Sequence, residues 1–257
     1  MQAYGQVFAK VYNTLWGGFA QYISPLLYDF YETSAISEMK QRMLDLCCGT
    51  GQLALFFLEK GYRVVGLDLS EHMLVYAREN AEDFVASGQA DFIQADAAEF
   101  TLDERFGLVV STFDALNHLE GEDALQGCFQ SVYRVLDDGG YFIFDLNTKE
   151  GLQRWNGVQV NPSEEVFLLT RGIFEPGSEK AWTKITGFVR TDEGLYQRFE
   201  ETVFNTVFDM ARVKELLLDS SFNEVYFARA DALDTPIDEP EAEGRVFFVA
   251  GKLPDES

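Results

Sequence analysis

Apolar and polar positions follow a regular pattern along the middle of the chain. From Met43 to Leu146, short apolar runs alternate with segments whose apolar residues recur at helical spacing. Mainly apolar runs are typical of strands buried on both faces of a parallel sheet. The pattern predicts five such strands, at Met43–Cys48, Arg63–Asp68, Asp91–Ala95, Leu108–Phe113 and Tyr141–Leu146.

The segments between these runs are predicted to be helices that cover the sheet. Ser70 is a good N-cap, and Gly61 can close the helix before it. Right-handed crossovers would then bring the carboxyl ends of all the strands to one edge of the sheet. The predicted helices are Gln52–Lys60, Ser70 to about Val85, and Asp123–Leu136, which is followed by a turn at Asp137–Gly140.

The pattern changes on both sides of this region. Residues 158–207 alternate with period two between turn signals, which predicts an antiparallel meander of about three strands. A helix at Met210–Ser220 and two strands, Glu224–Ala230 and Arg245–Lys252, follow. The first 40 residues are rich in aromatic side chains and predict one or two helices, which either pack in the core or form a lid over a pocket.

The composition of the chain limits which kinds of partner it is expected to bind. The chain has 257 residues and a net charge of −23, which would repel nucleic acid and anionic membranes. It contains no apolar run near the roughly 18–20 residues that span a bilayer, and Met1–Lys10 lacks the features of a signal peptide, so we expect a cytoplasmic protein. Three cysteines and two histidines show no metal-ligand spacing, and no metal site is expected.

A glycine turn carries the strongest chemical signal. Gly49-Thr50-Gly51 follows the first predicted strand, and Asp68 ends the second, where its carboxylate could accept hydrogen bonds from ribose hydroxyls. The segment GTGQLA also fits the dinucleotide fingerprint, which makes an NAD-dependent oxidoreductase an alternative. Asp45 opposes this alternative, because a carboxylate there would repel a pyrophosphate but suits a cationic ligand.

Several motifs in order resemble a known family. The segments LDLCCGTGQ, GLDLS, QADAAEF, FGLVVSTFDALNHL and VLDDGGYFIFDLNT resemble the successive motifs of class I S-adenosylmethionine-dependent methyltransferases. The meander after the fifth strand resembles the bacterial small-molecule type. The resemblance implies an α/β, Rossmann-like fold with a seven-stranded, mostly parallel sheet, a C-terminal antiparallel hairpin and a small antiparallel β insertion. The expected division is a helical lid (1–40), a cofactor-binding domain (41–150 and 208–253) and a substrate insertion (151–207).

The resemblance also implies roles for individual residues. Asp45 would meet the methionine ammonium, Asp68 the ribose, and Asp96 the adenine amino group. Cys47 stands where many relatives have glycine. Tyr12 could close over the sulfonium, because aromatic faces favour cations. The expected cofactor site comprises Tyr12, Asp45, Cys47, Gly49, Thr50, Gly51, Asp68, Leu69, Met73, Asp96, Ala97, Thr112 and Phe113.

Candidates for chemistry follow the fourth predicted strand. His118 could act as a general base, since its ordinary pKa lies near neutrality. Asp114 and Asn117 could orient an acceptor or fix the loop, and Tyr22 is a further candidate near the sulfonium. The acceptor itself is expected to be a small molecule methylated on nitrogen or oxygen, and a non-catalytic regulator that senses the cofactor is a further alternative. Its pocket could be shaped by Trp155, Arg171, Trp182 and Arg198.

Overall fold

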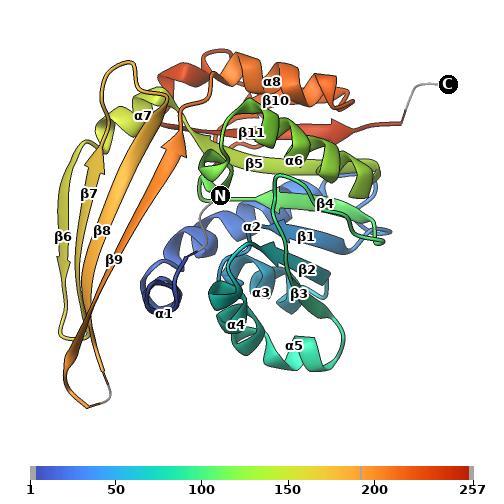
Figure 1. Ribbon diagram of the computed structural model, residues 1–257. Coiled ribbons are helices and arrows are strands. Elements are labelled where there is room, and N and C mark those ends of the chain that lie inside the picture. The colour runs from blue at the N-terminus through green and yellow to red at the C-terminus, as the bar shows by residue number, and fades with distance from the viewer. Residues whose placement is uncertain (1–3, 192, 255–257) are drawn as a thin grey trace.

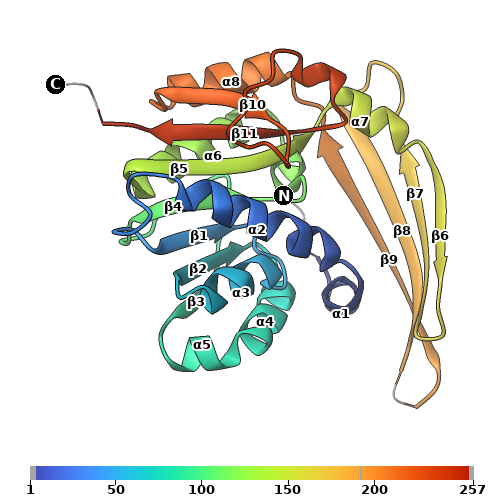
Figure 2. The ribbon, with the colours of Figure 1, turned by 180° about the vertical axis from the view of Figure 1, so that it is seen from behind.

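Two β-sheets stand side by side in the molecule (Figures 1 and 2). The computed structural model describes residues 4–191 and 193–254. The larger sheet has seven strands in the order β10-β11-β5-β4-β1-β2-β3, in which only β11 runs antiparallel to its neighbours. The predicted fold class is therefore confirmed. Its strands are β1 (Arg42–Leu46), β2 (Arg63–Asp68), β3 (Ala90–Gln94), β4 (Phe106–Ser111), β5 (Leu136–Asn147), β10 (Glu224–Ala228) and β11 (Arg245–Lys252).

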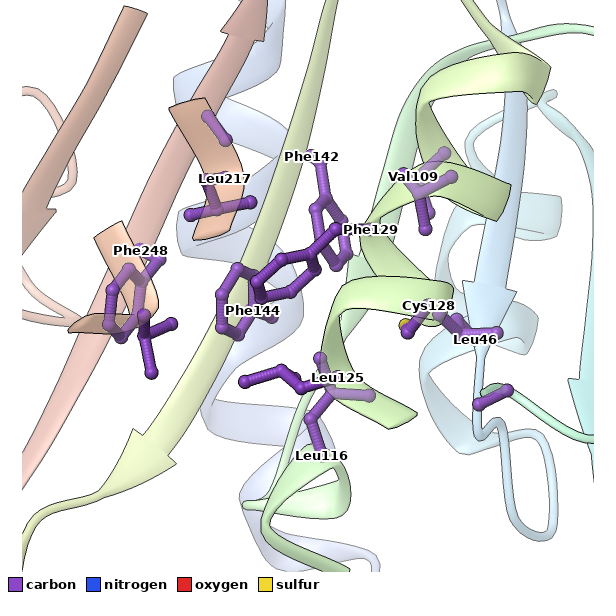
Figure 3. Packing of buried hydrophobic residues seen from close by; sticks show 14 of the residues in the cluster. Leu46, Val109, Leu116, Leu125, Cys128, Phe129, Phe142, Phe144, Leu217 and Phe248 are labelled. Carbon is purple, nitrogen blue, oxygen red and sulfur yellow. The ribbon is translucent and has the colours of Figure 1, made fainter. Parts of the chain in front are cut away.

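Helices cover both faces of this sheet, because successive strand residues point to opposite sides. On β1, Met43 packs with α2 and α3, whereas Leu44 packs on the opposite face with α6 and α8. Figure 3 shows the second face, where Phe129 of α6 contacts Phe144 and the ring of Phe144 stacks on Phe248 with centroids 4.7 Å apart. The covering helices are α2 (Gly18–Glu32), α3 (Gln52–Glu59), α4 (Glu71–Asn80), α5 (Glu82–Ala86), α6 (Glu122–Val135) and α8 (Met210–Asp219).

Two local predictions in this region were wrong. The helix predicted from Ser70 to Val85 is interrupted at Ala81, next to Asn80, whose side chain turns back to bind Asn13 and the carbonyl of Thr50. The segment predicted as a turn, Asp137–Gly140, lies within β5. Its turn residues instead distort the strand: Gly139 has φ +85°, and the register between β4 and β5 shifts at this end.

The second sheet has four antiparallel strands, where about three were predicted. They are β6 (Gly157–Pro162), β7 (Val166–Ile173), β8 (Lys180–Arg190) and β9 (Tyr196–Thr206), preceded by the short helix α7 (Lys149–Arg154). Buried and less buried residues alternate along β8, so one face of the sheet is turned inward. The N-terminal helix α1 (Gln6–Leu15) lies between that inner face and α4, where Phe8 and Val11 are buried against Met73 and Phe199.

The two N-terminal helices have different surroundings. Ile23, Leu27 and Tyr31 of α2 are fully buried in the main core, whereas α1 faces the second sheet. The predicted lid covers residues 1–40, of which the structure describes residues 4–40. Within that range, only α1 lies between the two sheets. No helix within the described part of the chain combines the length and hydropathy needed to cross a membrane.

Candidate functional site

A cavity of about 430 Å³ lies between the two sheets. The carboxyl ends of β1, β2 and β4 form one side, the inner face of the second sheet forms the opposite side, and α1 contributes aromatic rings. All strands of the parallel sheet deliver their following loops to this edge, as the crossover rule requires. Its lining residues are Tyr4, Phe8, Tyr12, Trp16, Cys47, Gly49, Asp68, Leu69, Ser70, Met73, Thr112, Phe113, Asp114, Ala115, His118, Trp155, Gly157, Gln159, Thr170, Gly172, Thr183, Ile185, Val203 and Asn205.

Asp68 organises the glycine turn at one end of the cavity. Its carboxylate accepts hydrogen bonds from the backbone amides of Gly49 at 2.9 Å and Ser70 at 2.8 Å. Gly49 adopts φ +55°, and a Cβ added there would lie 3.5 Å from the Tyr12 ring. Burial raises the pKa of Asp68, although the backbone amides oppose this shift. A ligand at this end therefore meets bare backbone, a carboxylate and an aromatic ring.

Asp45 lies behind the turn rather than in the cavity wall. It is buried in β1, and its Oδ2 has no hydrogen-bond partner among the residues that the structure describes. Burial raises the pKa of this carboxyl to about 7. The backbone of Ala54 hydrogen-bonds this carboxyl group. A second buried oxygen without a partner is costly, which indicates that it serves something other than packing.

The loop after β4 is held by an ion-pair network that sequence reasoning missed. Phe113 and Asp114 both have positive φ, of 66° and 50°, and both backbone amides donate to Asp145 at 2.7 and 2.9 Å. Arg245 pairs with Asp145 and, at 2.6 Å, with Asp114. Burial alone would lower the pKa of the Arg245 guanidinium. The two carboxylates raise this pKa by more than burial lowers it, so the guanidinium stays charged. The sequence did offer one signal for Asp145: it is an acidic residue within the apolar end of β5, where a buried acid needs a partner.

His118 lines the cavity, and its two ring nitrogens have different partners. It ends the short helix η1 (Ala115–His118), and its Nδ1 lies 2.6 Å from the carbonyl oxygen of Phe204. A carbonyl oxygen only accepts, so Nδ1 carries the hydrogen and Nε2 keeps a lone pair. Nε2 lies 3.5 Å from the hydroxyl of Tyr4. This geometry suits a proton acceptor.

Comparison with known proteins gives the family. A model described as a methyltransferase domain matches residues 43–140. The chain is 32% identical over 254 residues to a Bacillus subtilis (strain 168) protein named "Putative methyltransferase YqeM", and the alignment covers 96% of each chain. The chain belongs to the class I S-adenosylmethionine-dependent methyltransferases.

Solved structures agree with this fold. An S-adenosylmethionine-dependent methyltransferase from Clostridium acetobutylicum ATCC 824 has a TM-score of 0.79 at 22% identity, covering 96% of this chain and 98% of that one. The sugar N-methyltransferase KedS8 from Streptoalloteichus sp. ATCC 53650 has a TM-score of 0.74 at 18% identity, covering 99% and 96%. Family membership sets aside the alternative of an NAD-dependent oxidoreductase.

The methyltransferase cavity contains many of the expected cofactor residues. Those in its wall are Tyr12, Cys47, Gly49, Asp68, Leu69, Met73, Thr112 and Phe113, and those outside it are Asp45, Thr50, Gly51, Asp96 and Ala97.

Thr50 and Gly51, although outside the wall, support the turn. The Thr50 hydroxyl donates to Gln52, whose amide binds Asn13 of α1. A Cβ on Gly51 would lie 3.1 Å from the Cβ of Ala77, so α4 packs closely against the turn. Asp96 accepts from the Ala98 amide at 2.9 Å and shapes its own loop.

The structure separates the catalytic candidates of this methyltransferase. Asp114 and His118 line the cavity. Asn117 is buried, and its amide binds the backbone of Asn147 and Thr206, so it fixes the loop. Tyr22 is 51% exposed on α2 and does not line the cavity.

The expected acceptor residues also divide. Trp155 lines the cavity, whereas Arg171, Trp182 and Arg198 lie on the outer face of the second sheet. Because side chains alternate along a strand, the inward neighbours form the wall instead. These neighbours were not identified from the sequence: Gln159, Thr170, Thr183, Ile185, Val203 and Asn205.

Proposed function

We propose that this enzyme transfers the methyl group of S-adenosylmethionine to nitrogen or oxygen of a small molecule held in the cavity between the two sheets. One observation carries the proposal. The same cavity is lined by Gly49 and Asp68, by His118 and by the inner face of the second sheet. Donor and acceptor would therefore share one cavity.

The residues present fit this cofactor. S-adenosylmethionine carries a net positive charge at neutral pH, and the described lining residues include two carboxylates, Asp68 and Asp114, but no lysine or arginine. Asp68 would hold the ribose, Gly49 would allow close backbone approach, and Leu69 and Met73 would flank the adenine. The unpartnered oxygen of Asp45 lies behind the turn, where it favours the methionine ammonium, directly or through water.

When bound, the cofactor supplies a methyl group already activated on a sulfonium, so the chain needs to add little covalent chemistry. The aromatic residues Tyr4, Phe8, Tyr12 and Trp16 exclude water from the cavity, and their ring faces favour a cation. Holding two reactants in contact can supply about 7–11 kcal/mol of the barrier. His118 would take the acceptor proton on Nε2, because Nδ1 is committed to Phe204.

The surroundings of the cavity support a small acceptor. Its far wall is the inner face of the second sheet, with α1 on one side and Trp155 among the lining residues. Its volume of about 430 Å³ is in the range of cavities that hold small molecules. The fold similarity to a sugar N-methyltransferase is in keeping with a small acceptor.

Formation of S-adenosylhomocysteine, followed across a panel of small amines, alcohols and phenols, tests the proposal. With an acceptor that turns over, we expect His118→Gln to lower kcat by about 10²–10⁴-fold. Affinity for S-adenosylhomocysteine should change less than twofold. Cofactor binding with no turnover on any acceptor would favour the non-catalytic regulator, and an unchanged kcat in His118→Gln would remove the base assignment.

A further inference from the structure

We propose that the methyl acceptor is an amine that carries no phosphate or carboxylate group. This inference rests on the proposed function and deepens it. Its basis is the distribution of charge around the cavity, in particular the placement of every basic residue of the second sheet.

The second sheet directs all its basic side chains away from the cavity. Thr183, Ile185 and Val203 face inward, so their alternate neighbours along β8 and β9 face outward. Each basic residue of β6–β9 occupies an outward position. These residues are Arg171, Lys180, Lys184, Arg190 and Arg198.

Four of these five outward cations also contact an acid or an aromatic ring. Lys184 and Arg198 both pair with Glu200, at 2.8 and 2.5 Å. Arg190 pairs with Glu165 at 3.3 Å. The ammonium of Lys180 lies 4.0 Å from the centre of the Phe204 ring.

The inner face carries neutral polar groups and one acid. Gln159, Thr170, Thr183 and Asn205 supply amides and hydroxyls to the cavity. Glu201 lies opposite Ile185 and therefore on the inner face, where its carboxylate accepts from the Gly5 amide at 3.2 Å. The wall can thus hydrogen-bond a polar acceptor, but its described residues offer no positive side chain to an anion.

Arg245 is a cation beside the loop after β4, but it does not provide a positive charge for an anionic acceptor. It pairs with Asp114 and Asp145, so two acidic side chains already engage its guanidinium. The guanidinium also lies 4.9 Å from the ring centre of Phe19 and 5.6 Å from that of Phe113. A phosphate or carboxylate on the acceptor would lose its hydration without gaining an ion pair, which is unfavourable.

An amine suits both the charge distribution around the cavity and the proposed general base, His118. A protonated amine is attracted by Asp114 and by the aromatic faces, and it passes its proton to Nε2 of His118. The freed nitrogen lone pair then forms the new carbon–nitrogen bond as the carbon–sulfur bond breaks, and the electron pair of that bond stays on sulfur. An aliphatic hydroxyl holds its proton far more tightly than an imidazole can remove it, so the base favours nitrogen over oxygen.

Matched acceptors test the inference directly. Three sets suffice: tyramine, tyrosol and tyrosine; glucosamine, glucose and glucosamine 6-phosphate; and aniline, phenol and 4-aminobenzoate. Release of S-adenosylhomocysteine should occur at least tenfold faster with a plain amine than with the alcohol or the anionic member of its set. Faster turnover of an alcohol, carboxylate or phosphate member would overturn the inference.

A second measurement requires no acceptor. In a Trp16→Phe/Trp182→Phe variant, fluorescence reports only Trp155, which lines the cavity and is 39% exposed. We expect caesium to quench it at least about threefold better than iodide at constant ionic strength, because the local field repels anions. Thr183→Lys should reduce that ratio, whereas Thr186→Lys, on the outer face of the same strand, should not.

The outcomes separate the two proposals. Equal quenching by iodide and caesium, with no response to Thr183→Lys, would overturn the inference about the acceptor even if no compound of the panel turned over. Failure to bind S-adenosylhomocysteine in calorimetry would instead overturn the proposed function.

Discussion

The buried carboxyl of Asp45 makes the stability of the protein depend on pH. Its folded-state pKa of about 7 lies above the value of about 3.9 expected in the unfolded chain. The folded protein therefore holds this proton more tightly. The stability associated with this proton is fully present below a pH of about 4. It is lost as the pH rises toward about 7, because the unfolded chain releases the proton before the folded protein does. The enzyme thus keeps a destabilising charge at a position that suits a cationic ligand.

Asp45→Asn should remove this pH dependence. Between pH 5 and pH 8 the wild type should lose about 2–3 kcal/mol more unfolding free energy than the variant, measured by urea denaturation. Asp91→Asn, at an exposed position of β3, should behave as the wild type. Parallel curves for Asp45→Asn and wild type would show that the carboxyl is ionised in the folded protein throughout this range.

Cys47 occupies a backbone conformation that favours glycine. Its φ is +63°, and it stands where the sequence resemblance led us to expect glycine in many relatives. Cys47→Gly should be about 1 kcal/mol more stable than Cys47→Ala, because both lose the thiol but only alanine keeps a Cβ in the left-handed region. Equal melting temperatures for the two variants would contradict this explanation.

At the scale of elements, Arg245 joins the start of β11 to the loop after β4. Arg245→Met should lower the free energy of unfolding by about 3–5 kcal/mol, because it leaves Asp145 buried without its partner. Arg229→Met removes a solvent-exposed pair with Glu243 and should cost less than about 1 kcal/mol. Similar losses in the two variants, measured by denaturant unfolding, would show that burial does not set the strength of the Arg245 pair.

The sequence predicted the strands best where the local pattern of apolar residues alone determines them. The central strands of the parallel sheet are mainly apolar runs. Asp68 ends one of them and His118 lies in the loop after another, so their position at the ligand edge could be foreseen. Local turn chemistry misled at Asp137–Gly140, because the residues on both sides pair with neighbouring strands. Leu136 pairs with Phe106 and Gly140 with Lys252, so the glycine-rich segment forms an irregular part of β5.

The supporting network could not be predicted from local pattern. Arg245 and Asp114 are 131 positions apart, and Asn13 and Asn80 are 67 apart. No periodicity in the sequence connects such partners. The acceptor wall was missed for a related reason: the meander was recognised, but which of its faces turns inward depends on how α1 packs against it.

At the scale of the whole molecule, the enzyme divides its task between two sheets. The parallel sheet supplies the glycine turn and Asp68, and the antiparallel sheet supplies a wall without basic side chains. Helix α1 is buried between them and is tied to the turn through Asn13 and Gln52. This arrangement explains how a strongly acidic protein can select cationic ligands from solution.

The central claim is that this cavity binds S-adenosylmethionine through Asp68. Isothermal titration calorimetry with S-adenosylhomocysteine tests it most directly, using wild type, Asp68→Ala and the exposed control Asp91→Ala. We predict one-to-one binding by the wild type and the control, and at least about tenfold weaker binding by Asp68→Ala, since a charged hydrogen-bonding partner is lost. Equal affinity in all three proteins, or tighter binding of NAD than of S-adenosylhomocysteine by the wild type, would contradict the claim.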